Sequence, residues 1–214
     1  LGLFNISTAS AFVVAAAGGK VAKHGNRSIS SKSGSADVLE AAGINLNLSP
    51  KVISECIEKI GVGFMFAPAH HSAMKHAIGP RKELAVRTIF NVLGPLTNPA
   101  KAPNQVIGVY DRNLVEPIAN VLKSLKSRHV MVVHSADGLD EFSVADKTFV
   151  AELYNDEVST YSVHPDDFGL KLGNLNDIKA ENADESLSLI YEAFSGHNGT
   201  AKNIIALNCF VAKF

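Results

Sequence analysis

The chain of 214 residues lacks several features that would assign it to a functional class at once. It has only two cysteines, Cys56 and Cys209, on apolar stretches without metal-site spacing, so we expect free thiols and a cytoplasmic protein. The longest apolar run, residues 9–19, is too short to span a bilayer, so we expect no membrane association. A Gly-x-Ser-x-Gly elbow, a Walker loop and a Cys/His nucleophile pair are also absent, so no residue is a candidate for covalent catalysis.

Acidic residues are missing from the start of the chain, where the first is Asp37. Segment 23–35 instead holds three cations, one histidine, two glycines and five serines. Backbone amides freed by glycine, serine hydroxyls and cationic side chains all suit phosphate oxygens, so the segment predicts an anion-binding site. A solvated serine-rich loop is the alternative. The net charge of −1 and the lack of interleaved aromatics argue against nucleic-acid binding.

The hydrophobic periodicity predicts an α/β protein. Side-chain oxygens of segment 5–8 would cap a buried helix over 9–17, and the hydroxyls of Ser7 and Thr8 would form a second phosphate site unless they serve capping alone. A strand, a helix and a strand over 105–134 predict a right-handed crossover in a parallel sheet. The expected helices are 35–42, one from Ser49, 81–92 stopped at Gly94, 114–125 and 184–194; the expected strands are 62–66, 105–110, 128–134 and a hairpin of 148–154 with 158–163.

Three acidic residues, Asp137, Asp140 and Glu141, would lie beyond the carboxyl end of the strand 128–134, where ligands gather in such sheets. The pair Asp140–Glu141 is a poor neighbour for phosphate unless a cation lies between them, which favours Mg²⁺ and a phosphorylated substrate. An acidic turn in solvent is the alternative. The histidines at 70, 71 and 76 lack the spacing of a zinc site on a helix, and His24 is the better active-site candidate.

Together these segments resemble the anthranilate phosphoribosyltransferase family. The resemblance rests on Asn-Ile-Ser-Thr at 5–8, Lys-His-Gly-Asn-Arg at 23–27 followed by Ser30 and Ser31, Gly-Ser-Ala-Asp-Val-Leu-Glu at 34–40, Phe-Ala-Pro at 66–68 with His71, Ala73 and Met74, the segment from Arg81 to Thr88, and Asn-Val-Leu-Gly-Pro-Leu-Thr-Asn-Pro at 91–99. It implies transfer of the phosphoribosyl group of 5-phosphoribosyl 1-diphosphate to the amine of anthranilate, in tryptophan biosynthesis. It also implies a large domain like that of the nucleoside phosphorylases, with a mostly parallel central sheet flanked by helices. Helices in about 67–95 would contribute to a small helical domain.

The resemblance also implies roles for individual residues. Mg²⁺ would be held by Ser7, Asp140 and Glu141. Asn26 and Arg81 would contact anthranilate, with His24 and His71 lining the same side. The diphosphate substrate would be held by residues of the two predicted phosphate sites: Asn5, Ser7, Thr8, Lys23, His24, Gly25, Asn26, Arg27, Ser28, Ser30, Ser31 and Ser35. The family further implies a homodimer and a glutamine amidotransferase as a possible partner.

The chain departs from the family pattern at its ends. The Gly-Thr-Gly-Gly-Asp loop expected before residue 5 is absent, so we expect a fragment of one large domain over 1–214, truncated at both ends and catalytically impaired. Ala85 and His70 also depart from the usual glycine and aromatic residue. A nucleoside phosphorylase-like enzyme and a non-catalytic subunit that binds phosphoribosyl diphosphate are the alternatives.

Overall fold

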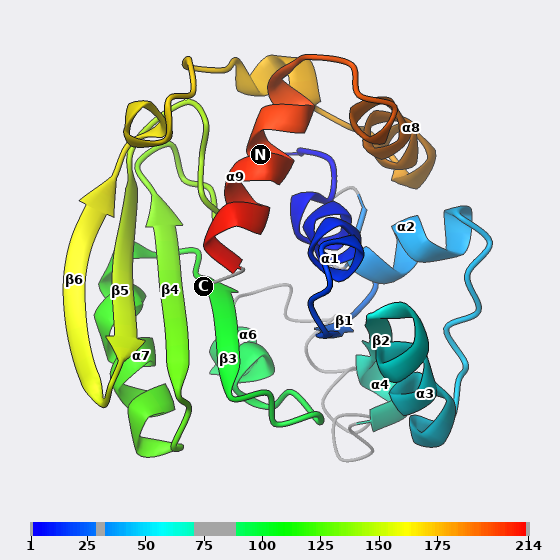
Figure 1. Ribbon diagram of the computed structural model, residues 1–214, viewed down its shortest axis with the longest axis horizontal. Coiled ribbons are helices and arrows are strands. Elements are labelled where there is room, and N and C mark those ends of the chain that lie inside the picture. Colours follow the sequence, from blue (N-terminus) through cyan, green and yellow to red (C-terminus); the bar gives the residue numbers. More distant parts are fainter. Residues whose placement is uncertain (1, 29–32, 71–88, 213–214) are drawn as a thin grey trace. The chain divides into compact units, whose positions relative to one another are not determined.

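The computed structural model describes residues 2–28, 33–70 and 89–212 (Figure 1). The chain divides into two compact units, and each is described by itself. The N-terminal unit comprises Gly2–Lys101 with Ala180–Ser188, and the C-terminal unit comprises Ala102–Lys179 with Leu189–Phe214. Helix α8 (Ala183–Phe194) therefore begins in the N-terminal unit and ends in the C-terminal unit.

The N-terminal unit is built around a parallel pair of strands. β1 (Val21–Gly25) pairs with β2 (Val62–Phe66), so both strands run to the same edge. Helices α1 and α3 pack against this pair. The core includes Leu39 and Leu46, with Phe64 and Phe66 packed against them. The described helices of this unit are α1 (Ile6–Ala16), α2 (Ser35–Ala41), α3 (Pro50–Ile60), α4 (Ala67–His70) and α6 (Ile89–Leu96).

Local signals explain α3 well. The Oγ atom of Ser49 accepts a hydrogen bond from the Val52 N–H at 3.4 Å, and Pro50 occupies the first turn. Gly61 ends the helix in the left-handed conformation with φ of 81°, which glycine adopts without steric cost. The predicted start at Ser49 is confirmed.

The C-terminal unit contains a four-stranded sheet in the order β3-β4-β5-β6. β3 (Asn104–Gly108) and β4 (His129–Ser135) are parallel, with η2 (Arg112–Leu114) and α7 (Val115–Ser124) between them, which confirms the predicted order of strand, helix and parallel strand. β5 (Thr148–Tyr154) and β6 (Glu157–Val163) form the predicted antiparallel hairpin. The α/β class is confirmed, while this sheet is mixed because β4 and β5 are antiparallel.

One face of this sheet is covered by α7, which packs on β4, β5 and β6 (Figure 1). The contacting core is apolar, with Ile118 and Leu122 of the helix buried, as are Val132 and Leu153 of the sheet. The chain continues through η3 (Pro165–Phe168), η4 (Leu175–Ile178) and α8 to α9 (Thr200–Ala212), which packs against η4. Within the described ranges, every helix falls short of the length and apolarity that a membrane span requires.

Some expected boundaries are wrong. α1 begins at Ile6 rather than residue 9, because Asn5 alone is the N-cap, and burial is confined to its first half. α6 continues through Gly94 and Pro95 to Leu96; Pro95 lies inside this helix, where it has no N–H to donate to the carbonyl group one turn earlier. The third strand ends at Gly108 instead of residue 110, although Val109 still donates a hydrogen bond to Val133 O at 2.9 Å. Most of the helix expected over 81–92 lies outside the described residues.

Candidate functional site

The start of α1 holds the first group of predicted phosphate-binding residues. Oδ1 of Asn5 accepts a hydrogen bond from the Thr8 N–H at 3.1 Å, so Asn5 caps the helix. The Asn5 N–H donates to Oγ of the buried Ser186 at 2.9 Å, which fixes the cap in place. The Thr8 hydroxyl is buried and has no hydrogen-bond partner within the described ranges. The Ser7 side chain is exposed in the first turn, where the helix dipole favours an anion.

Lys23 connects this helix start to the cationic segment. Its Nζ donates a hydrogen bond to Oγ of Ser7 at 3.0 Å. The two groups of residues that the sequence assigned to phosphate binding are therefore in contact within the N-terminal unit. Gly25 is the last residue of β1. A Cβ on Gly25 would lie 2.9 Å from Cε2 of Phe64 and 3.2 Å from Cβ of Ser35. Glycine at this position allows the first residue of α2 to approach the end of the strand.

A single carboxylate oxygen secures the backbone that follows β1. Oδ2 of Asp37 accepts hydrogen bonds from the N–H groups of Ser28 at 2.9 Å and Gly34 at 2.8 Å. A Cβ on Gly34 would lie 2.5 Å from the Ser28 nitrogen and 2.7 Å from the Asn26 oxygen, so this close approach requires glycine. Residues 26–28 are thereby fixed against the first turn of α2.

Arg27 is paired with acidic side chains of α2. Its guanidinium forms a two-point interaction with Glu40, in which Nη2 lies 2.6 Å from Oε1, and Nη1 lies 3.7 Å from Oδ1 of Asp37. The guanidinium also lies over the ring of Phe66, 5.5 Å from its centroid. The hydrogen bond with Glu40 raises the pKa of Arg27 further above its usual value. The predicted contact of Arg27 with the substrate stays a prediction, and the substrate would meet a cation that already has carboxylate partners.

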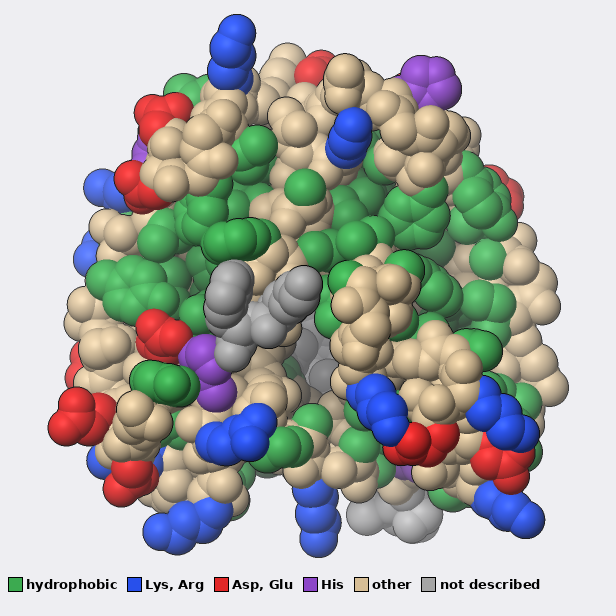
Figure 2. Space-filling model, viewed as in Figure 1, with side chains coloured by type: hydrophobic (Ala, Val, Ile, Leu, Met, Phe, Trp, Pro, Cys, Tyr) green, Lys and Arg blue, Asp and Glu red, His purple; other side chains and the backbone are tan. Residues whose placement is uncertain are grey.

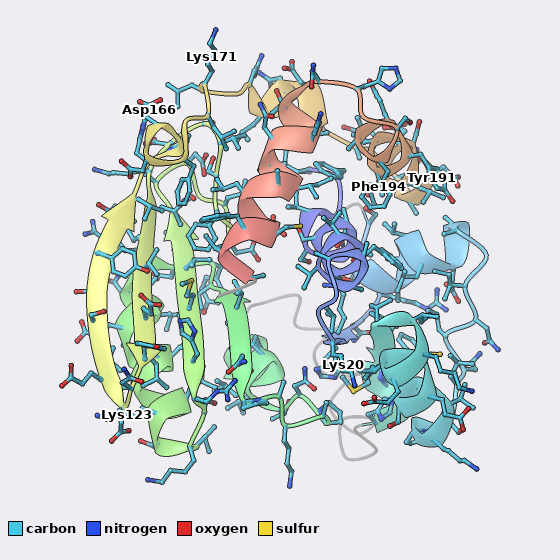
Figure 3. The ribbon with its side chains drawn as sticks, in the orientation of Figure 1. Lys20, Lys123, Asp166, Lys171, Tyr191 and Phe194 are labelled. Carbon is cyan, nitrogen blue, oxygen red and sulfur yellow. The ribbon has the colours of Figure 1, made fainter. Side chains whose placement is uncertain are left out.

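Lys20 differs from Lys23 although both come from the same short segment. Lys20, which is labelled in Figure 3, precedes β1 at the end of the strand opposite to Gly25. Its ammonium pairs with Glu58 of α3. On the face shown in Figure 2, Lys and Arg side chains lie among Asp and Glu side chains instead of forming one basic patch. The two lysines therefore differ in role because they lie at different positions along β1: Lys23 lies at the candidate site, and Lys20 forms an ion pair on the surface.

The anthranilate side is described only in part. His24 lies on β1 opposite Met65 and is half-buried. Asn26 is exposed, and its Oδ1 accepts a hydrogen bond from the Arg27 N–H at 2.8 Å. The other two predicted residues, His71 and Arg81, lie outside the described residues, as do Ser30 and Ser31 of the cationic segment.

The acidic pair belongs to the loop after β4 in the C-terminal unit. Asp140 is exposed and Glu141 is half-buried. The backbone of Asp140 crosses so close to β3 that a Cβ on Gly108 would lie 1.6 Å from the Asp140 carbonyl oxygen. The buried Oγ of Ser135 donates a hydrogen bond to the Glu141 carbonyl oxygen at 3.0 Å. The pair therefore lies beyond the carboxyl ends of the parallel strands, as predicted.

Asp137 has a structural role in the same loop. Its Oδ1 accepts a hydrogen bond from the Leu139 N–H at 3.1 Å, and its Oδ2 accepts one from Oγ of Ser143 at 2.5 Å. These bonds close the turn that leads to Asp140. Among the residues that the structure describes, no group of three or more His, Cys, Asp or Glu side chains could hold a metal ion. Asp140 and Glu141 offer two carboxylates, and Ser7, the third predicted ligand, belongs to the N-terminal unit.

Sequence reasoning missed several residues that shape the site. It notes Asp37 as the first acidic residue of the chain and as part of a family motif, without a role of its own, and it also gives Glu40 no role. The capping pattern Gly-Ser-Ala-Asp at 34–37 could have indicated that Asp37 binds backbone N–H groups at the start of α2. The close approach of Gly108 to Asp140 has no local signal in the sequence. Gly108 ends β3, whereas Asp140 lies in the loop after β4.

Comparison with known proteins places these residues in a family. The family model described as "Glycosyl transferase family, a/b domain" matches residues 2–213. The anthranilate phosphoribosyltransferase of Ruthia magnifica subsp. Calyptogena magnifica is 74% identical over 208 residues, covering 97% of this chain and 61% of that protein. The anthranilate phosphoribosyltransferase of Thioalkalivibrio sulfidiphilus is 61% identical over 213 residues, covering 100% of this chain and 63% of that protein.

Solved structures agree with the sequence comparison. The anthranilate phosphoribosyltransferase of Thermus thermophilus matches with a TM-score of 0.91 and 40% identity over 100% of this chain and 64% of its own. The Saccharomyces cerevisiae enzyme in complex with PRPP and Mg matches with a TM-score of 0.88 and 28% identity over 98% of this chain and 60% of its own. The chain thus spans less than two thirds of the length of these relatives. Since the family model covers residues 2–213, the chain belongs to the glycosyl transferase family defined by this a/b domain.

Proposed function

We propose that the chain provides the phosphoribosyl diphosphate-binding part of an anthranilate phosphoribosyltransferase. In this reaction the amine of anthranilate attacks C1 of 5-phosphoribosyl 1-diphosphate. The bond from C1 to the diphosphate oxygen breaks, and pyrophosphate leaves with the bonding electrons. The new bond is between nitrogen and C1, and the nitrogen loses one proton. The names of the relatives support this assignment, at 74% and 61% identity.

The observation that carries the proposal is the hydrogen bond from Lys23 Nζ to Ser7 Oγ. It places an ammonium group at the positive end of α1, beside an exposed hydroxyl, and both groups are suited to diphosphate oxygens. Asn5, Thr8 and residues 23–28 surround this contact in the chain, and we assign them to the same substrate. Ser30, Ser31 and Ser35 complete the proposed set.

The acidic pair fits Mg²⁺ by the chemistry of its donors. Mg²⁺ takes oxygen ligands and is usually held by one or two carboxylates together with substrate phosphates. Asp140 and Glu141 supply adjacent carboxylates on a backbone fixed at Gly108 and Ser135. We assign the ion to this pair and Ser7. When bound, Mg²⁺ supplies positive charge that stabilises the departing diphosphate.

The protein's own residues bind and orient the substrates. Lys23 and the N-terminal amides of α1 stabilise the negative charge that develops on the leaving group. We assign Arg81 to the carboxylate of anthranilate, since a guanidinium can bind a carboxylate at two points. Asn26, His24 and His71 line the same side and orient the amine toward C1. Positioning and electrostatic stabilisation are sufficient for this reaction without a protein nucleophile.

We extend the proposal to the organisation of the whole protein. Helices in about 67–95 contribute to a small helical domain, and the protein is a homodimer with a glutamine amidotransferase as a possible partner. The reduced state of Cys56 and Cys209 supports a cytoplasmic location. Size-exclusion chromatography with light scattering tests the oligomeric state: a dimer supports this part of the proposal, and a monomer at micromolar concentration contradicts it.

The direct test is calorimetric titration of 5-phosphoribosyl 1-diphosphate with Mg²⁺ into the full-length protein. Lys23→Met removes a charged group of the protein that donates a hydrogen bond to the substrate. Such a bond contributes about 1.5–3 kcal/mol, so the Kd should rise about 10-fold to 150-fold. Lys20→Met is the matched control, because its ammonium pairs with Glu58 instead. Its Kd should stay within about twofold of the parent. Equal effects of the two substitutions, or no effect of Lys23→Met, would contradict the proposal.

The same preparation separates the alternative functions. Formation of N-(5-phosphoribosyl)anthranilate, detected by mass spectrometry, supports the transferase. Tight binding of the diphosphate without product from the full-length protein would indicate a non-catalytic subunit. Phosphorolysis of thymidine or uridine without dependence on anthranilate would indicate a nucleoside phosphorylase.

A further inference from the structure

Asn208 of α9 forms a set of hydrogen bonds with a backbone segment 66 residues away in the chain. Its Oδ1 accepts from the Phe142 N–H at 3.1 Å, and its Nδ2 donates to the Phe142 carbonyl oxygen at 2.9 Å. Nδ2 also donates to the Ile204 carbonyl oxygen at 2.8 Å, within α9 itself. All of these groups belong to the C-terminal unit. The orientation of the amide is fixed by its partners, because only nitrogen can donate to two carbonyl oxygens.

The contact is buried and leaves no polar atom of the amide unsatisfied. Asn208 is 8% exposed and Phe142 is 1% exposed. Burying an amide is costly unless it forms hydrogen bonds. An apolar side chain of similar size would fill the space, but it would leave the N–H and carbonyl groups of Phe142 without these partners. Asn208 is therefore suited to holding the backbone of Phe142, in addition to filling space in the core.

Phe142 directly follows Asp140 and Glu141, so the hydrogen bonds of Asn208 act next to the acidic pair. Gly108 lies against the backbone of Asp140, and Ser135 binds the carbonyl group of Glu141. Asn208 supplies the third anchor, and it is the one that comes from a helix outside the sheet. With both groups of Phe142 bound, the backbone after Glu141 cannot turn without breaking two hydrogen bonds at once.

We propose that Asn208 is a positioning residue for Asp140 and Glu141, and that it acts on them through the peptide of Phe142. It touches neither substrate nor metal. Its effect on metal affinity rests on the proposed function, which assigns Mg²⁺ to the acidic pair. Its effect on the Phe142 backbone does not depend on that assignment. Removal of a group that orients metal ligands without binding the metal commonly lowers the metal affinity by about 10-fold to 100-fold.

The test compares Asn208→Leu and Asn208→Ala with Leu207→Ala in the full-length protein. Leu207 is a buried apolar residue of the same helix, 3% exposed, and its truncation creates a cavity without removing a polar anchor. Mn²⁺ binding is measured by electron paramagnetic resonance with 5-phosphoribosyl 1-diphosphate present. Exchange of the Phe142 amide hydrogen is measured without metal. Thermal unfolding records the loss of stability in each variant.

The proposal predicts that both Asn208 variants weaken Mn²⁺ binding at least about tenfold and accelerate exchange at Phe142 at least about tenfold. Leu207→Ala should lower the unfolding temperature but leave both quantities within about twofold. Unchanged exchange at Phe142, equal effects of Leu207→Ala, or failure of both Asn208 variants to fold would overturn the proposal. Faster exchange combined with Mn²⁺ binding that Asp140→Asn does not weaken would instead refute the metal assignment, and Asn208 would still position this backbone.

Discussion

Gly108→Ala tests whether the close approach of the acidic loop to β3 determines where the carboxylates lie. A Cβ at this position would lie 1.6 Å from the carbonyl oxygen of Asp140 and 2.6 Å from its carbonyl carbon. Carbon and oxygen atoms in contact stand about 3.5 Å apart, so one backbone must move by about 2 Å. Overpacking a core usually costs about 1–3 kcal/mol, and a clash between two backbones lies at the upper end, at about 3 kcal/mol.

The measurements are thermal unfolding and Mn²⁺ binding. For a chain of this length, about 3 kcal/mol corresponds to a fall of roughly 6–12 °C in Tm. Displacement of the acidic pair should also weaken Mn²⁺ binding at least about tenfold. Gly199→Ala is the control in the same unit: a Cβ there meets no atom within 4 Å, and its cost should stay below about 1 kcal/mol. Parental stability and parental metal affinity of Gly108→Ala would refute the reasoning.

Three further substitutions test the anchors of the two sites. Asp37→Ala removes the acceptor of two backbone N–H groups at the start of α2; urea unfolding should show a loss of about 2–3 kcal/mol, and a loss below about 0.5 kcal/mol would show that these bonds are not maintained. Glu40→Gln weakens an exposed ion pair with Arg27, so urea unfolding should show no measurable loss of stability; a clear loss would contradict the exposed character of this pair. Ser135→Ala removes a buried hydrogen bond to the Glu141 carbonyl, with an expected loss of about 1–3 kcal/mol by thermal unfolding; equal stability of variant and parent would contradict that role.

The parts of the fold that follow from local chemistry were predicted from the sequence. Ser49 and Pro50 start α3 and Gly61 ends it, because capping and backbone conformation depend on neighbouring residues. The hairpin of β5 and β6 follows from two short strands around the turn at Asn155 and Asp156, both of which have positive φ.

The anchors of the acidic pair could not be predicted in this way. Asn208 appears in the sequence as a polar residue within the apolar run 204–212, and its partner Phe142 is 66 residues earlier. Gly108 appears as an ordinary residue inside the predicted strand 105–110. Both act through tertiary contacts, which a periodic pattern does not encode. The contact between Lys23 and Ser7 is intermediate: each residue was assigned to phosphate binding, but only the structure shows that they meet.

The central claim is that this chain takes part in transfer of a phosphoribosyl group to anthranilate. The most direct measurement follows the loss of anthranilate fluorescence and the release of pyrophosphate together, in the full-length protein with 5-phosphoribosyl 1-diphosphate and Mg²⁺. The account predicts equal molar amounts of anthranilate consumed and pyrophosphate released, with both rates reduced by Lys23→Met and unchanged by Lys20→Met. Pyrophosphate release that does not depend on anthranilate, or no consumption of anthranilate, would contradict it.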